Sequence, residues 1–317
     1  GLHYFASPDG IRWREMNDGK EVIPYAPSWK HAFDSQNVAF WSEAEGHYVC
    51  YFRAWMPKDD AQPPEGRAAT TGEHGGKGHL RTIARTTSPD FIHWSEPVLT
   101  YANMPGEHLY TSQTHPYYRE PSLYIALPTR YMAGRVGEKK THGMKGSTDV
   151  LLMSARAGSP GYERLFPGAF IRPGLDPDRW GNRANYVAQN VVPTGPKEMS
   201  IYHTSGHRYT LRPDGFVSIH TGYQPGALLT RPVIFEGSEL VINYSTSAAG
   251  EVKVELQTPE GQPIPGFTLA DCPPIVGDQI ERTVSWEGGS GLAALAGRPV
   301  RLRFVMNECD LYSFRFR

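Results

Sequence analysis

Short stretches in which apolar and polar side chains alternate recur along the whole chain, and turn residues separate them. Alternation with a period of two places successive side chains on opposite faces of a β-strand. No stretch shows the periodicity of a helix longer than two turns. The pattern therefore predicts an all-β protein built from many short strands.

One turn motif recurs between these strands. Residues 7–13 (Ser-Pro-Asp-Gly-Ile-Arg-Trp) are echoed by residues 88–94 (Ser-Pro-Asp-Phe-Ile-His-Trp) and more loosely by residues 212–216 (Arg-Pro-Asp-Gly-Phe). Proline presets the first corner of a β-turn, aspartate binds the local backbone, and glycine accepts the positive φ that closes the turn. The second and third copies each follow a predicted strand, at residues 82–86 and 207–211. Such a repeat is typical of the outer strands of β-propeller blades.

Three whole blades follow from this spacing. Their opening strands share a Ser-Gln or Ala-Gln element, which we expect at equivalent positions beside a central channel. Residues 1–30 are typical of the closing half of an earlier blade. Since an incomplete ring leaves a sheet edge exposed, we expect a β-propeller whose missing N-terminal blades belong to the same natural polypeptide, or alternatively come from elsewhere. The first blade is assigned to residues 32–41, residues 48–53 and the strand before the Ser88 turn. The second blade is assigned to residues 109–113, 123–127 and 149–154. The third blade is assigned to residues 185–190, 199–202 and 207–211.

Two other regions differ in character. Residues 57–79 are polar, rich in Gly and Pro and without periodicity, which predicts a long loop inside the first blade; a flap over the channel mouth and an ordinary insertion both fit. From residue 226 on, alternating strands with charges on one face indicate a β-sandwich. We therefore predict propeller blades over residues 1–225 and a sandwich over residues 226–317. The sandwich strands are assigned to residues 239–244, 251–256, 282–286, 300–305 and 311–316.

Composition and charge narrow the range of partners that the protein can have. The 32 basic and 33 acidic side chains among 317 residues nearly cancel, so no strong field points toward nucleic acid or an anionic membrane. No apolar run is long enough for a membrane helix. Aromatic residues make up 12% of the chain, which suits platforms for a flat ligand such as a sugar. We expect a carbohydrate partner, neither nucleic acid nor membrane, and a secreted or periplasmic location.

Cofactor chemistry finds little support. The 3 cysteines form neither a disulfide framework nor a spaced metal site: Cys50 is interpreted as a core residue, and pairing of Cys272 with Cys309 stays open. The 12 histidines lack the spacing of a transition-metal site. Phosphate-binding Gly loops and the Gly-x-Ser-x-Gly nucleophile motif are absent from the sequence. We expect no cofactor, with a structural calcium ion in the channel left open.

The turn at residues 7–13, Asp34 in an opening strand, and the order of propeller and sandwich resemble the five-bladed β-propeller glycoside hydrolases of the invertase and arabinanase type, families 32 and 43. Through residues 110–113, 128–130, 179–183 and 243–250, the chain is also similar over nearly its whole length to bacterial proteins of unassigned role. The first resemblance implies hydrolysis of glycosidic bonds by three carboxylates at the propeller mouth. One of the three is expected in the missing blades.

The resemblance assigns Asp34 as one catalytic carboxylate and either Glu107 or Glu120 as the acid. Glu107 is preferred because residues 107–110 lead into an opening strand from the channel side. Cleavage requires one carboxylic acid to protonate the leaving oxygen and one carboxylate to attack or to activate water. The alternatives are that Asp34 caps a turn or pairs with an arginine, that Glu107 is a surface acid, and that Glu120 forms a structural ion pair.

Arginines and polar aromatic residues gather at the same predicted mouth. Guanidinium groups bind carboxylates and sulfates through paired hydrogen bonds, so a uronic or sulfated sugar is a suitable ligand for them. The alternative is that they brace carboxylates between blades. The residues predicted to contact the substrate are His31, Gln36, Arg53, Tyr110, His115, Arg130, Arg183, Asn185 and Tyr186.

The sequence thus predicts a glycoside hydrolase acting on a poly- or oligosaccharide, with Asp34 and Glu107 as its catalytic pair. A carbohydrate-binding propeller without catalysis is the alternative. A protein-interaction platform is a weaker third reading, because the opening strands carry many polar and charged side chains. Two carboxyl groups about 5 to 10 Å apart across a pocket favour catalysis, whereas aromatic and arginine side chains with a single acid favour binding.

Overall fold

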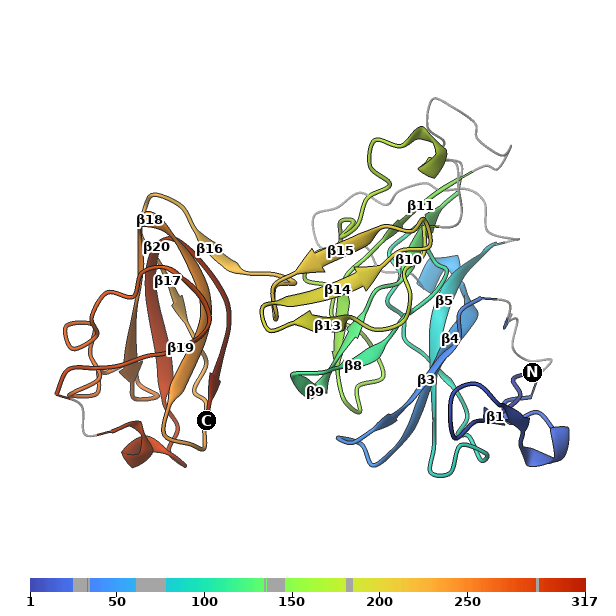
Figure 1. Cartoon of the computed structure of the whole chain (residues 1–317), viewed down its shortest axis with the longest axis horizontal. Helices are drawn as coiled ribbons and strands as arrows, with labels where there is room; N and C mark the ends of the chain where they lie inside the picture. Colours follow the sequence, from blue (N-terminus) through green and yellow to red (C-terminus); the bar gives the residue numbers. More distant parts are fainter. Residues whose placement is uncertain are drawn as a thin grey trace. The chain divides into compact units, whose positions relative to one another are not determined.

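The computed structural model describes residues 1–24, 33, 35–60, 78–133, 135, 146–180, 185–288 and 291–317. Over these residues the chain consists of antiparallel β-strands and short 3₁₀ turns (Figure 1). The predicted all-β class is confirmed. Two compact units are present, residues 1–192 with 201–209, and residues 193–200 with 210–317. The division after residue 225 and the number of blades stay predictions.

The first large sheet is a four-stranded antiparallel meander. It consists of β3 (Val38–Ser42), β4 (His47–Pro57), β5 (His79–Ser88) and β6 (Val98–Leu99), hydrogen-bonded in that order. This is the first blade predicted from the sequence. The predicted loop at residues 57–79 connects β4 to β5, and its residues 61–77 lie outside the described part of the chain.

The second predicted blade is present as strands that bend. β7 (His108–Leu109), β10 (Thr129–Met132) and β11 (Ser147–Val150) form one sheet, while β8 (His115–Tyr117), β9 (Glu120–Ala126) and β12 (Met153–Arg156) form another. β9 leads into β10 and β11 leads into β12 after two intervening residues each, so the two sheets are consecutive halves of the same strands. Bridges from Val150 to Ile171 and from Ser154 to Glu163 add a further edge.

A three-stranded sheet corresponds to the third predicted blade. It contains β13 (Val192–Gly195), β14 (Glu198–Tyr202) and β15 (Arg208–Leu211), in that order. At the N-terminus, β1 (Phe5–Ala6) pairs with β2 (Arg14–Glu15), and Leu2 bridges to Ile23.

Buried apolar side chains join the first and second blades into one core. The cluster packs residues of β3, β4 and β5 on residues of β7, β9 and β12 and of the adjoining loops. Side chains of one face are thereby removed from water, and this is the main stabilising term of such a fold. The members are Val38, Val49, Tyr51, Ile83, Ala102, Leu109, Ala126, Leu151 and Met153.

The recurring turn is identical in its first two copies. The Asp9 carboxylate accepts the N–H groups of the residues two and three positions later, at 2.9 and 2.8 Å, and Asp90 does the same at 2.9 and 2.8 Å. The indole N–H of Trp13 donates to the Gly10 carbonyl at 3.1 Å. In the second copy, Trp94 donates to the equivalent carbonyl at 3.0 Å. The sequence repeat is therefore a structural repeat.

The third copy is a different turn. Here Asp214 itself has a positive φ of 60°, and its carboxylate accepts the hydroxyl of Ser313 at 2.6 Å. In the first copy the positive φ falls on Gly10, at 71°. The shared Pro-Asp-Gly residues thus do not place the aspartate equivalently.

The second unit contains one five-stranded sheet whose central strands turn a corner. β16 (Ile219–Thr221), β17 (Gly226–Leu229) and β18 (Leu240–Gln257) join β19 (Asp278–Thr283) through the long β20 (Arg301–Phe316). The register of β18 on β20 shifts between Thr246 and Glu251. The predicted strands at 239–244 and 251–256 are therefore two halves of β18, and those at 300–305 and 311–316 are two halves of β20.

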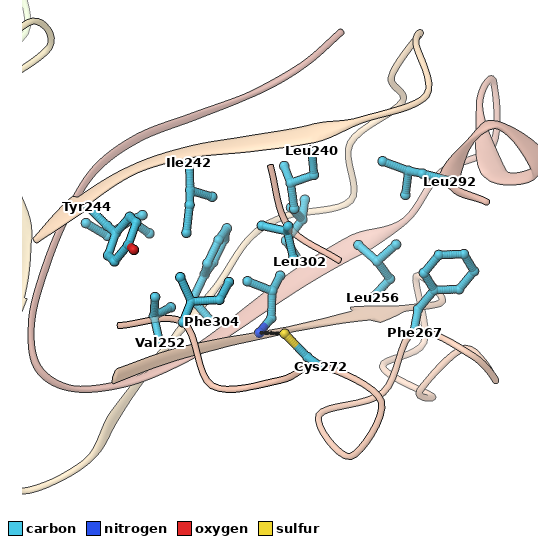
Figure 2. Close-up of a cluster of buried hydrophobic side chains, with 14 of the residues drawn as sticks. Leu240, Ile242, Tyr244, Val252, Leu256, Phe267, Cys272, Leu292, Leu302 and Phe304 are labelled. Carbon is cyan, nitrogen blue, oxygen red and sulfur yellow. Dashed lines mark hydrogen bonds between the residues drawn. The ribbon is translucent and has the colours of Figure 1, made fainter. Parts of the chain in front are cut away.

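The two halves of β18 face each other across a core (Figure 2). Leu240 and Ile242 of the first half point toward Val252 and Leu256 of the second, with Phe304 of β20 between them. The corner requires a residue without a side chain, because a Cβ on Gly250 would lie 2.4 Å from the carbonyl oxygen of Glu308. A single sheet folded in this way buries one face, as the alternating charges predicted.

The three cysteines are buried and free. Cys272 and Cys309 therefore do not form the disulfide that the sequence left open. Cys272 Sγ accepts the Val254 N–H at 3.4 Å, the contact drawn in Figure 2. Burial raises the pKa of the Cys50 thiol to about 12, so this thiol is not a reactive nucleophile. No helical segment in the described part of the chain has the length and apolarity of a membrane crossing.

Candidate functional site

The opening strands of the three blades converge on one backbone carbonyl. The amide nitrogen of Gln113 donates to the Val187 oxygen at 2.8 Å, and that of Gln36 approaches the same oxygen at 3.4 Å. Gln36 and Gln113 occupy the equivalent Ser-Gln positions of the first two blades, and Val187 lies in the third opening segment. These two contacts bring the three predicted opening segments together at the Val187 carbonyl.

Five side chains near this convergence form what we call the mouth cluster: Arg53 and Trp55 of β4, Arg81 of β5, Tyr110 and Tyr186. The guanidinium carbons of Arg53 and Arg81 lie 5.1 and 5.0 Å from the Tyr110 ring centroid. Arg81 also lies over Trp55, at 4.6 Å. Tyr110 and Tyr186 stack at 5.9 Å with an interplanar angle of 29°. Two cations and three aromatic rings therefore share one small volume.

The mouth cluster combines a buried cation with aromatic rings that stay partly exposed to solvent. Arg53 is buried, at 4% exposed, whereas Trp55, Arg81, Tyr110 and Tyr186 are half-buried. Burial and the neighbouring Tyr110 raise the pKa of Tyr186, against the opposing effect of the Arg53 and Arg81 guanidinium groups. The Tyr186 hydroxyl therefore stays protonated at neutral pH and can donate a hydrogen bond.

Three residues of this cluster were predicted from the sequence, namely Arg53, Tyr110 and Tyr186. Trp55 and Arg81 were missed. Trp55 lies two residues beyond Arg53 on the same strand and pairs directly with Arg81 on β5. The period of two along β4 was a usable signal for Trp55. The predicted partner strand began at residue 82, one position too late to include Arg81.

Glu107, the predicted acid, is a buried carboxylate inside an ion-pair network. It is 2% exposed, which excludes the alternative of a surface acid. Arg164 donates to both of its oxygens, to Oε1 at 3.1 Å, and the Met104 N–H donates to Oε2 at 2.9 Å. Arg130 Nη1 lies 3.6 Å from Oε1. Both oxygens are therefore occupied by hydrogen-bond donors, and a proton-donating role for Glu107 stays a prediction without geometric support.

Arg130 mainly binds a second carboxylate. Its Nε and Nη2 donate to the two oxygens of Asp149 at 2.9 and 2.6 Å, a bidentate pair. Its Nη1 donates to the Pro167 carbonyl at 3.2 Å. Arg130 therefore links Glu107, Asp149 and the Pro167 loop, which is the bracing alternative stated for the arginines.

His115 and Asn185 are engaged in backbone contacts. His115 Nε2 accepts the Val191 N–H at 3.1 Å, and its Nδ1 lies 2.9 Å from the Gln113 carbonyl. Burial lowers the pKa of His115. Asn185 accepts from Arg179 Nε at 3.1 Å and donates to the Thr148 carbonyl at 2.9 Å. Both side chains hold opening segments in place, and their predicted ligand contacts stay untested.

Asp34, His31 and Arg183 lie outside the described residues. Glu120, the alternative acid, is exposed at the start of β9 and accepts hydrogen bonds from the hydroxyl and the N–H of Ser122. Within the described ranges, no three His, Cys, Asp or Glu side chains come together as a metal site requires.

A second buried network joins the first two blades. The Glu45 carboxylate accepts the Tyr124 hydroxyl at 2.5 Å and pairs with Arg85, while Ser42 contacts the Tyr124 hydroxyl at 2.5 Å. Burial acts to raise the pKa of Glu45, but the hydrogen bonds from Tyr124 and Arg85 outweigh it and hold the pKa below its ordinary value of 4.5. Glu45 therefore favours the folded state above this pKa, and the contribution is lost as the pH falls through the lowered value.

We expect Glu45→Gln to lower the free energy of unfolding by about 2 kcal/mol at neutral pH, because Arg85 loses its buried counter-charge. The difference between variant and native protein should shrink in acid, where the native Glu45 is protonated too. Urea unfolding at a series of pH values from neutral down to about pH 3, well below the ordinary pKa of 4.5, follows this difference. A difference that stays constant over this range contradicts the ionised pairing of Glu45.

No family model matches the chain, nor does any curated protein. Among solved structures, it is similar to a glycoside hydrolase family 43 arabinoxylan arabinofuranohydrolase from Bacillus subtilis in complex with cellotetraose, at 13% identity and a TM-score of 0.36, over 98% of this chain and 72% of that one. It is also similar to a family 32 β-fructofuranosidase from Bombyx mori at 10% identity and a TM-score of 0.40, over 99% of this chain and 72% of that one. A variant of that enzyme in complex with sucrose is similar at 10% identity and a TM-score of 0.39, over 99% of this chain and 72% of that one. Both enzymes come from the two glycoside hydrolase families that the sequence resembles.

Proposed function

We propose that this chain binds carbohydrate at the mouth cluster and prefers sugars that carry carboxylate or sulfate groups. The observation that carries the proposal is the placement of Arg53 and Arg81, whose guanidinium carbons lie 5.1 and 5.0 Å from one Tyr110 ring. Half-buried aromatic rings such as Trp55 and Tyr110 offer apolar faces with polar edges, which suit a sugar ring. Guanidinium groups recognise carboxylates and sulfates through paired hydrogen bonds.

Glycoside hydrolysis at the same site is the second candidate. It is favoured by the position of Glu107, whose neighbour His108 lies against Trp55 at 6.4 Å and contacts Arg81. Hydrolysis requires a pair of carboxyl groups. Of the predicted pair, Glu107 is engaged by Arg164 and Asp34 lies outside the described residues. The described geometry therefore supports binding more directly than catalysis.

One panel experiment tests both functions. Neutral, uronate-containing and sulfated oligosaccharides are titrated onto the protein by calorimetry, and released reducing sugar is measured in parallel with native protein and Asp34→Asn. Binding of anionic sugars without release supports recognition alone. Release that Asp34→Asn lowers about a hundredfold supports hydrolysis. Binding of no sugar in any class refutes the proposed function.

A further inference from the structure

The backbone of Arg81 is held by two buried side chains, one from β7 and one from the segment before β7. The Arg81 N–H donates to His108 Nδ1 at 3.0 Å, and the Arg81 carbonyl accepts the amide nitrogen of Asn103 at 2.7 Å. The same Asn103 amide donates to the Glu107 carbonyl at 3.0 Å. His108 is 0% exposed and Asn103 2%. Both hydrogen-bonding groups of the Arg81 peptide are therefore fixed from the second blade.

The contact to His108 determines the protonation of its ring. Besides the Arg81 N–H, the guanidinium Nη1 of Arg81 lies 3.4 Å from the same Nδ1. Both groups are donors only, so Nδ1 must present its lone pair. The neutral ring then carries its proton on Nε2. Only one of the three protonation forms of the imidazole fits this arrangement.

We propose that His108 is a positioning residue that holds Arg81 in the mouth cluster through an unprotonated Nδ1, and that protonation of the ring releases Arg81 and weakens ligand binding. The binding half of this proposal rests on the proposed function, whereas the tautomer of His108 does not. A proton on Nδ1 directs an N–H at the Arg81 N–H and replaces an attraction by a donor–donor clash. It also sets an imidazolium against the Arg81 guanidinium.

Among the described residues, the groups that face His108 come from three neighbouring strands. From β5 it faces Arg81, and from β10 it faces Tyr131, with ring centroids 5.6 Å apart. Arg81 itself lies 5.8 Å from the Tyr131 ring. From β4 it faces the uncharged Trp55. The preceding Glu107 directs its carboxylate to Arg164. Within the described part of the chain, the Arg81 guanidinium contacts the ring, and it disfavours a second positive charge.

Two substitutions separate positioning from general packing. His108→Asn retains an acceptor near the place of Nδ1 but cannot be protonated, whereas His108→Leu removes the acceptor. We expect His108→Leu to weaken binding of a heparin-derived tetrasaccharide about tenfold at neutral pH, and His108→Asn to restore most of it. The sulfates of this probe stay ionised, so a change with pH reports the protein.

The pH profile gives the decisive readout. As the pH is lowered from about 7.5, native affinity should fall more steeply than that of His108→Asn, because only the native ring can gain a charge. Burial and the Arg81 guanidinium oppose this charge, so the difference should appear toward the acid end of the range in which the protein stays folded. His93→Asn, which removes an exposed histidine on the turn after β5, should keep the native profile. An acid loss that persists unchanged in His108→Asn overturns the proposal.

A third measurement needs no ligand. Nitrogen-15 spectra of histidine-labelled protein should show His108, assigned by its absence in His108→Asn, with a bare Nδ1 and a protonated Nε2 at neutral pH. The protection of the Arg81 amide hydrogen, measured as its exchange rate relative to the intrinsic rate at the same pH, should decrease in His108→Leu and, in the native protein, in acid, but not in His108→Asn. A proton on Nδ1 at neutral pH refutes the positioning role even if sugars bind. Absence of sugar binding together with the expected tautomer refutes the proposed function and the release of ligand, and leaves the positioning contact standing.

Discussion

Glu107→Gln is expected to lower the free energy of unfolding by about 3 kcal/mol, because removing one member of a buried ion pair leaves the partner charge without compensation. Arg164, whose side chain is 6% exposed, donates to both oxygens of Glu107. Glutamine preserves the shape but offers one oxygen and no charge. Urea unfolding at neutral pH, with a common slope for both proteins, measures the difference.

The same variant separates the two roles available to Glu107. A general acid that is replaced by its amide loses about a hundredfold in rate at little cost in stability. A structural carboxylate loses stability first. A Glu107→Gln protein of native stability therefore contradicts the network role. A hundredfold loss of hydrolysis at that stability would support the assignment of Glu107 as the acid.

Two comparisons sharpen this result. Glu239→Gln removes an exposed carboxylate paired with Arg317 and should leave the unfolding midpoint nearly unchanged. The double variant Glu107→Gln with Arg164→Met removes both charges of the buried pair. It should lose less than the two single variants added together, because neither charge is left uncompensated.

Sequence reasoning succeeded where local chemistry decides the structure. The Ser-Pro-Asp turn carries its own hydrogen bonds, from Asp90 to N–H groups two and three residues later, so its repeat could be recognised without a partner. The period of two fixed the strands and, through the blade openings, brought Arg53, Tyr110 and Tyr186 to one place. The corner in β18 was visible only as a gap between two predicted strands.

Sequence reasoning was less successful where the residue that contacts a given side chain lies far away along the chain. Arg164 is 57 residues from Glu107, in a segment between β12 and β13 without any period that sequence reasoning detects. A glutamate after Pro-Gly reads locally as an exposed loop acid. Only the tertiary fold supplies the arginines that bury it. The role of His108 was hidden for the same reason, since its acceptor role depends on a backbone N–H 27 residues away.

Arg81→Met is expected to weaken binding of an anionic oligosaccharide about thirtyfold, with a loss of less than about threefold for a neutral one of the same length. Methionine retains an apolar stem against Trp55, so the rings of the mouth cluster keep their packing while the charge is removed. Calorimetric titration of a uronate oligomer and its reduced, neutral counterpart measures the two losses.

Matched variants distinguish an effect of the Arg81 charge at the mouth cluster from an effect of the net charge of the protein. Arg156→Met removes an exposed arginine at the end of β12 and should bind both sugars as the native protein does. Arg81→Lys keeps the charge but not the planar fork, so it should recover only part of the affinity for the uronate. Native affinity should also fall with added salt more steeply than that of Arg81→Met, because one screened attraction is gone from the variant. Equal losses for the charged and the neutral sugar would show that Arg81 acts by packing, and would remove the basis for an acidic ligand.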